Sequence, residues 1–170
     1  MPDTPKQARS LWPLPGGAGQ YLASLDTILH MVDETTDTGA VLDQIVATFE
    51  RVRSRKAGRS YLHVVADLGL VNLDGPAVRL TASGRRYLKT GDVALVRKAL
   101  LERVDGIAEL LLLLGQRPMR IGLLHERMQT SGYRWSTMSQ VRYRLRWLEE
   151  VGAVTRHGTA RPEYRMRTAN

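Results

Sequence analysis

Apolar residues recur at every third or fourth position through most of the chain, which is the spacing of one face of an α-helix. The first stripe of this kind contains Leu22, Leu25, Ile28, Leu29 and Val32. A second stripe runs from Leu42 to Phe49, after the turn sequence "DETTDTG". Asp37 or Thr38 can cap the start of this second helix. The pattern predicts two amphipathic helices near the beginning of the chain.

The rest of the first half changes its periodicity from helix to hairpin. The string "SYLHVVADLGLV" predicts a third helix that ends at Gly69 with a glycine C-cap. Next, "LVNL" and "AVRLT" surround "DGP" and predict a short β-hairpin. The string "TASGRRYLKTGD" predicts another short helix. The segment from Asp92 to about Val104 predicts a helix whose inward face holds Val93, Val96, Leu100 and Leu101.

The second half follows a similar order. The string "IAELLLLLGQRP" predicts a helix that is apolar on most sides and therefore buried, with a break at Pro118. The string "MRIGLLHERMQTSG" predicts the next helix, and "STMSQVRYRLRWLEEVGAV" predicts the one after it. The closing string "AVTRHGTARPEYRMR" predicts a second hairpin.

The two halves match when one is shifted by 83 positions, so that "SYLHVVADLGLV" aligns with "YRLRWLEEVGAV". The matched pairs are Leu62 with Leu145, Val65 with Leu148, Leu68 with Val151, Gly69 with Gly152, Val71 with Val154, and Gly75 with Gly158. Ser54 and Thr137, both suited to cap a helix, also coincide. These matches indicate an internal repeat of three helices and a hairpin.

This order of elements is similar to that of the winged helix-turn-helix family. The resemblance covers roughly residues 19–91 and 105–167, and rests on the helix that ends in "LGLV" or "VGAV", the glycine-centred hairpin, and the string "LTASGRRYL". That last string looks like the wing-to-helix passage of bacterial regulators. The chain also resembles, more weakly, the tandem winged helices of bacterial restriction and phage-defence proteins.

The resemblance implies a mainly α fold with small β-hairpin wings, arranged as two winged helix-turn-helix domains in tandem. We expect the domains at 19–91 and 105–170, with a linker helix at 92–104. Residues 1–18 contain four prolines and predict a flexible tail. Members of the family bind DNA with the third helix in the major groove and the wing on phosphate or in the minor groove, although some bind proteins or RNA.

The third helix of the second half predicts an outward basic face. Thr137 followed by Gln140 fits a capping box, so we expect the helix to begin there. Val141, Leu145 and Leu148 fall on one side of the helix. The opposite side presents Ser139, Arg142, Tyr143 and Arg146.

Guanidinium groups on this face can bond guanine or clamp phosphate. We expect the bases to be read by Ser136, Ser139, Gln140 and Tyr143, and Arg146 to reach the DNA backbone. Glu149 and Glu150 would repel phosphate, so they must point away from DNA or pair with arginine.

The first half and the second wing supply the remaining candidate residues. The third helix of the first half presents Lys56, Arg59, Ser60 and His63 outward, with Arg55 beside them. Residues 51–61 hold five basic side chains and no acidic one. The second wing offers Arg156, His157 and Arg161. The alternative is that both faces are simply solvated.

Charge favours an anionic partner. The chain has a formal net charge of +8, and residues 117–170 hold 11 arginines against four acidic residues. We therefore expect the second domain to bind DNA more strongly than the first. The composition is 43% hydrophobic, which is enough for a buried core.

The sequence contains none of the common catalytic or metal-binding motifs. The chain has no cysteine, and its four histidines do not form a zinc pair such as HxxxH or HExxH. Neither a phosphate-binding loop nor a GxSxG elbow is found. We therefore expect no enzyme activity, cofactor or metal. The opening residues lack the apolar core of a signal peptide, and the longest apolar run is too short for a membrane span, which predicts a cytoplasmic protein, nucleoid-associated when bound.

The sequence thus predicts a duplex-DNA-binding protein, as a regulator or a DNA-targeting subunit. The alternative is a protein-interaction adaptor of a restriction or defence complex, and a third reading is an RNA-binding winged helix. Trp12, in "LWPLP", can anchor a protein partner through the tail or pack on its own domain. An exposed Trp147 would favour a protein interface, whereas a buried one would serve the core.

Overall fold

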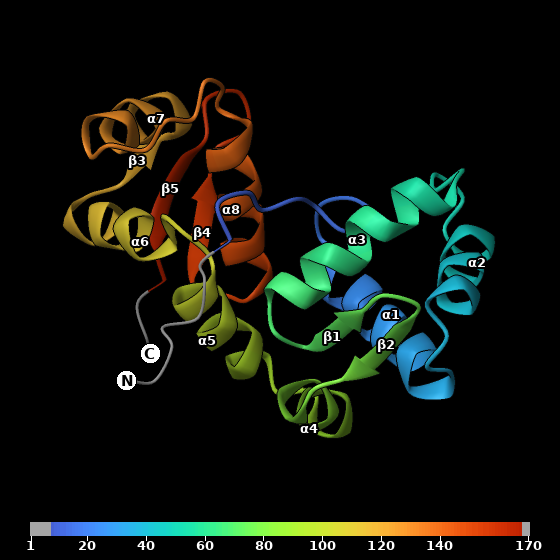
Figure 1. The fold of residues 1–170 in the computed structure, drawn as a ribbon. Coiled ribbons are helices and arrows are strands. Elements are labelled where there is room, and N and C mark those ends of the chain that lie inside the picture. Colours follow the sequence, from blue (N-terminus) through green and yellow to red (C-terminus); the bar gives the residue numbers. More distant parts are fainter. Residues whose placement is uncertain (1–7, 168–170) are drawn as a thin grey trace.

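The computed structural model describes residues 8–167, which form a mainly helical protein with two small antiparallel sheets (Figure 1). The elements are α1 (Tyr21–Glu34), α2 (Thr38–Thr48), α3 (Arg55–Asp67), β1 (Val71–Asp74), β2 (Ala77–Leu80), α4 (Ala82–Thr90), α5 (Val93–Arg103), α6 (Ile107–Gln116), β3 (Met119–Arg120), α7 (Ile121–Thr130), α8 (Ser139–Glu150), β4 (Val154–His157) and β5 (Glu163–Met166). Within residues 8–167, no helix is long and apolar enough to cross a bilayer.

The first half consists of three helices followed by the hairpin β1–β2. Asp37 caps α2 by accepting a hydrogen bond from the Ala40 backbone amide, and Ser54 caps α3 in the same way. The hairpin pairs Val71 with Leu80 at its open end. Just before α2, Asp37 also forms an antiparallel bridge with Ala77, so the chain entering α2 lies along the second hairpin strand.

The second half has the same order. Helices α6, α7 and α8 are followed by the hairpin β4–β5, and the short strand β3 before α7 pairs with β5. Its pairing of Arg120 with Glu163 corresponds to the bridge between Asp37 and Ala77. Arg120 follows Asp37 by 83 positions, whereas Glu163 follows Ala77 by 86. The second hairpin is therefore three residues longer than the first, and the topology is otherwise shared.

The turn that follows α3 and the turn that follows α8 are built alike. Gly69 and Gly152 both have a left-handed backbone, with φ of +70° and +67°. Their amides donate to Ala66 at 2.8 Å and to Glu149 at 3.0 Å, again 83 positions apart. A left-handed residue at this point favours glycine, because a Cβ would crowd the following carbonyl. The matched pairs of apolar residues before each glycine are buried.

The two halves pack together instead of standing apart. Their buried side chains belong to one hydrophobic cluster, and α1 of the first half contacts α8 of the second. Helix α5, which joins the halves, begins at the N-cap Asp92. Val96 and Leu100 are buried on its inner side, but Leu101, which we expected there, is 39% exposed.

Residues 8–19 form an ordered segment that we call the N-terminal strap. Figure 1 shows it, in blue, crossing between α8 and α3 before it enters α1. Leu11 and Leu14 are only 1% and 2% exposed. Ala8 bridges to Val104 at the end of α5, and the Ser24 hydroxyl donates to the carbonyl oxygen of Pro15.

The strap differs from the flexible tail that we expected for residues 1–18; residues 1–7 of that tail lie outside the described part of the chain. Proline and glycine content suggested a chain without fixed contacts. The segment instead buries two leucines and gives its backbone carbonyls to side chains of α8. Proline suits this role, because an extended segment that lacks some amide donors needs fewer partners.

Candidate nucleic-acid interface

The side of α3 that the helical projection predicted to face outward is exposed in the structure. Ser54 accepts a hydrogen bond from the Ala57 amide at 3.2 Å and fixes the start of the helix. Leu62 and Val65 are fully buried on the inner face. The outer face leaves four side chains exposed: Lys56, Arg59, Ser60 and His63. Within residues 8–167, neither Lys56 nor Arg59 makes an ion pair with a carboxylate.

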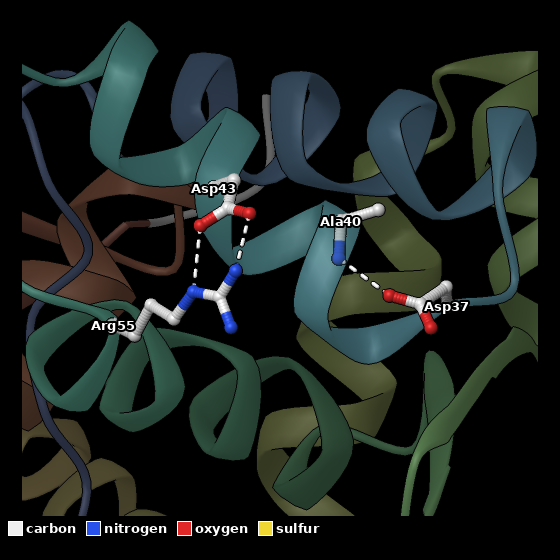
Figure 2. A network of polar contacts seen from close by, with 4 residues as sticks. All are labelled: Asp37, Ala40, Asp43 and Arg55. Carbon is white, nitrogen blue, oxygen red and sulfur yellow. Dashed lines mark hydrogen bonds and ion pairs between the residues drawn. The ribbon is translucent and has the colours of Figure 1, made fainter.

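Arg55, at the start of α3, is held by α2. Its guanidinium forms a two-pronged ion pair with Asp43, with 2.6 Å between Nε and Oδ1 (Figure 2). The hydrogen bond from Arg55 lowers the pKa of Asp43, and Asp43 raises the pKa of Arg55. Both side chains are exposed, so the pair adds little stability but fixes the direction of the guanidinium. The charge of Arg55 is thus offset by Asp43, whereas no ion pair within residues 8–167 offsets the charges of Lys56 and Arg59.

Helix α8 has three faces, whereas the sequence projection distinguished two. Val141, Leu145 and Leu148 are fully buried in the core of the second half, as expected. A second face lies under the strap and α1, and consists of Gln140, Tyr143, Arg144 and Trp147. The third face carries Ser139, Arg142 and Arg146, which are half-buried. We call this third face the free face of α8; it is directed away from the core, and Arg146 at its edge lines a cavity with Ala18 and Gly19 at the end of the strap.

Gln140 is engaged inside the protein. Its side-chain oxygen accepts hydrogen bonds from the Leu11 amide at 3.1 Å and from Arg144 Nη1 at 2.7 Å. It does not complete the capping box that the sequence suggested, because α8 begins at Ser139 without a side-chain cap. Thr137 instead accepts from the Ser139 amide at 3.4 Å, and Ser136 is exposed in the preceding loop.

Arg144 is fully buried, and the sequence analysis did not single it out. Its guanidinium donates to the carbonyl oxygens of Asp105, Gln140 and Arg9 at 2.8, 3.0 and 3.1 Å. It also lies 4.2 Å from the centre of the Trp135 ring. Burial lowers the pKa of Arg144 to about 10. Arg144 therefore connects α8 to three other parts of the protein: the strap, the turn before α6 and the loop before α8.

Trp147, on α8, and Trp12, on the strap, are in contact, but only one of them is buried. Trp147 is fully buried, and its indole Nε1 donates to the Trp12 carbonyl oxygen at 3.0 Å. The Trp12 side chain points outward, is 54% exposed and stacks on Tyr143, with 5.9 Å between ring centres. Tyr143 is thus partly covered by the strap. Of the two alternatives for Trp147, exposure at a protein interface or burial in the core, the structure shows burial.

The second wing lies beside the free face of α8. Arg156, on β4, forms an ion pair with Glu149 at 3.4 Å, so Glu149 meets an arginine as we expected. Burial raises the pKa of Glu149, and the charges of Arg156 and Arg146 oppose this. A cavity of about 330 Å³ is lined here by Ala18, Gly19, Arg146, Glu149, Glu150 and Arg156. Its two arginines and two glutamates balance, so it does not select an anion.

The outer end of the second wing is open to solvent. His157 and Arg161 are exposed, and the His157 ring lies 3.1 Å from the Thr155 hydroxyl. The candidate residues therefore fall into two groups. One is the outer face of α3, and the other comprises the free face of α8 with the wing β4–β5. No cluster of three or more metal-ligating side chains occurs within residues 8–167.

Comparison of the chain with models of known protein families, with curated proteins and with solved structures gave no match.

Proposed function

We propose that the protein binds duplex DNA, with the outer face of α3 in the major groove. The observation that carries this proposal is the exposure of Lys56, Arg59, Ser60 and His63 on one side of a capped helix whose opposite side is buried. A helix fits the major groove, where arginine and lysine can bond guanine and serine can bond several bases. The hairpin β1–β2 follows α3 directly, as a wing follows the recognition helix in the winged helix-turn-helix family.

The second half contributes contacts to the DNA backbone in this proposal. Gln140 is occupied by the strap, so α8 has lost one of its expected base readers. Arg142 and Arg146 on the free face, and Arg161 on the wing, remain for phosphate. The net charge of +8 favours such contacts. A tandem winged-helix regulator or DNA-targeting subunit of the bacterial cytoplasm is the class of protein that this proposal describes.

The test is fluorescence anisotropy with a labelled duplex of about 20 base pairs, which spans two turns of DNA. The variant Lys56→Ala with Arg59→Ala removes two charges from α3. Its matched control is Arg86→Ala with Lys89→Ala, which removes two exposed charges from α4. We expect the α3 variant to bind at least tenfold more weakly than the control. Equal losses in both variants, or no binding by the unaltered protein, would reject the proposal.

A protein-interaction adaptor is the second candidate. It is favoured by Leu112, which is 61% exposed on α6 and lies far from any expected DNA contact in sequence. A partner with an apolar surface would bury this side chain. Absence of binding to duplex DNA, single strands and duplex RNA would favour this candidate, and Leu112→Glu would then be expected to abolish partner capture. Binding to duplex RNA alone would favour the RNA-binding alternative.

A further inference from the structure

The indole of Trp12 is exposed but fixed in place. Leu11 before it and Leu14 after it are buried, and its carbonyl oxygen accepts the hydrogen bond from Trp147. One side of the ring stacks on Tyr143 with an angle of 30° between the planes. These contacts hold the backbone on both sides of Trp12, so its outward position is not that of a loose chain end. Over half of a large apolar side chain is thereby presented to solvent.

Three arginines lie close in sequence to the two members of this aromatic pair. Tyr143 lies on α8 one turn before Arg146 and beside Arg142, and Arg9 is exposed on the strap three residues before Trp12. None of these three arginines forms an ion pair within residues 8–167. Two acidic residues of α8 lie near Arg146 and partly offset its charge: Glu149, which pairs with Arg156, and Glu150, which accepts a hydrogen bond from the Leu22 amide. An open aromatic face among free guanidinium groups matches a base with its flanking phosphates.

The same arrangement disfavours insertion of α8 into the major groove. The groove is about 12 Å wide and admits a single helix of about that diameter. Here the strap runs along α8 and is bonded to it at Gln140, Arg144 and Trp147. A helix with a second chain segment against its side is too wide for the groove. The α8 surface is therefore better suited to nucleic acid whose bases are not enclosed in a duplex.

We propose that Trp12 and Tyr143 form a stacking platform for an unpaired base, and that the ligand is duplex DNA with a single-stranded extension. This rests on the proposed function, in which α3 holds the duplex part. The outer face of the indole receives the base, and Arg9 and Arg142 receive the phosphates on either side of it. Stacking on an aromatic ring tolerates any base, so the platform recognises the unpaired state and not a sequence.

The test compares three probes with the full chain: a blunt duplex of about 20 base pairs, the same duplex with about ten unpaired thymidines at one end, and the thymidine strand alone. We expect the extension to tighten binding by about tenfold, which is typical of one or two stacked bases. Trp12→Ala should remove this gain and leave the affinity for blunt duplex unchanged, whereas Trp12→Phe should keep most of it. Thermal unfolding of each variant checks the fold, since the contacts of residue 12 with α8 include its backbone.

The outcomes separate the two proposals. Equal affinity for the blunt and extended duplexes, or an undiminished gain in Trp12→Ala, overturns the platform while duplex binding through α3 stands. Binding of the thymidine strand that is lost in Trp12→Ala, together with no binding of blunt duplex, supports the platform and overturns the assignment of α3. Quenching of tryptophan fluorescence by the extension, absent in Trp12→Phe, supports the platform independently, because Trp147 is buried and Trp135, which is partly buried, is present in both proteins.

Discussion

Arg97 and Arg103 lie six positions apart on α5, and each donates a hydrogen bond at the end of a different basic helix. Arg103 Nε lies 3.0 Å from the Asp67 carbonyl oxygen at the end of α3, and Arg97 Nη2 lies 2.6 Å from the Val151 carbonyl oxygen after α8. Cations favour the carboxyl ends of helices, where carbonyl oxygens lack partners. The helix between the two halves thus holds both candidate DNA-contacting helices by their ends.

Gly69→Ala tests this contact at α3. A Cβ at position 69 would lie 2.7 Å from Arg103 Nε, and φ there is +70°. We expect a loss of about 2 kcal/mol in the free energy of unfolding, of which about 1 kcal/mol is conformational. In the Arg103→Ala background the loss should fall to the conformational part, since the clash is removed. Gly152→Ala is the control, because its nearest neighbour, Arg167 Nη1, is 3.2 Å away. Urea unfolding measures the unaltered protein, both single variants, the double variant and the control, and equal losses in both backgrounds would contradict the clash.

Two glycines within helices predict opposite effects of the same substitution. In α4, a Cβ at Gly84 would lie 2.0 Å from the backbone oxygen of Leu70, which cannot move without disrupting the turn after α3. Gly84→Ala should therefore cost about 3 kcal/mol or prevent folding. In α6, a Cβ at Gly115 meets nothing within 4 Å, so Gly115→Ala should stabilise the protein by about 0.5–1 kcal/mol. Thermal unfolding distinguishes the two, and a stable Gly84→Ala would rule out the close approach.

Replacement of Arg144 by methionine keeps a long side chain but removes every hydrogen bond that it donates. Three backbone carbonyl oxygens and the side-chain oxygen of Gln140 would lose this donor in a partly buried setting, so we expect a loss of about 3 kcal/mol. The strap should also become susceptible to limited proteolysis, because Arg9 is one of the three. Arg142→Met, two positions away and half-exposed, is the control and should change stability by less than about 0.5 kcal/mol. A strap that stays resistant in Arg144→Met would show that its leucines suffice to hold it.

The ion pair between Asp43 and Arg55 predicts a dependence on pH. The folded pKa of Asp43 is lowered, so its contribution to stability is present above the unfolded pKa near 4 and disappears as pH falls through the lower folded value. Asp43→Asn should therefore lower the urea midpoint slightly at neutral pH and not at all at about pH 2. The variant also removes a negative charge beside α3, so duplex binding should strengthen at neutral pH. Unchanged affinity would indicate that Arg55 lies outside the DNA contact.

The dependence of DNA binding on salt measures the number of phosphates contacted. If the protein neutralises about six phosphates, the logarithmic slope of affinity against salt should be near −5 between about 50 and 200 mM. Changing both Arg142 and Arg146 to alanine should reduce the slope by about 2 and weaken binding, with little loss of stability, because neither is fully buried. An affinity that does not change with salt in the unaltered protein would remove the phosphate contacts from the proposal. Normal DNA binding by a folded double variant would show that this face of α8 does not contact DNA.

Local signals in the sequence accounted for much of the fold. The caps at Asp37 and Ser54, the terminal glycines and the alternation of apolar residues act within a few positions, so the helices and both hairpins follow from short windows. The shift of 83 positions also holds in the hydrogen bonds of the turns after α3 and α8. The short strand β3 and the Asp37 bridge were missed, because each involves too few residues to produce a periodic pattern.

The site was harder to predict because its decisive contacts join distant residues. Gln140 looked like a base reader when only its helix was considered, yet its partner Leu11 lies 129 positions away. Arg144 stood between Tyr143 and Leu145, at the boundary of a two-faced projection, and no nearby carboxylate marked it as buried. The outer face of α3 was easier, since no segment of residues 8–167 covers it and the helical projection alone describes it.

The strap also imposes an order on biosynthesis. Trp12 is translated 135 residues before Trp147, the side chain that bonds its carbonyl oxygen. While the ribosome makes the intervening residues, the strap segment has no α8 to bind, so its hydrogen bonds to Gln140, Arg144 and Trp147 form only after α8 emerges. A chain interrupted before α8 would lack these hydrogen bonds. Completion of α8 is therefore the event that fixes residues 8–19 on the second half.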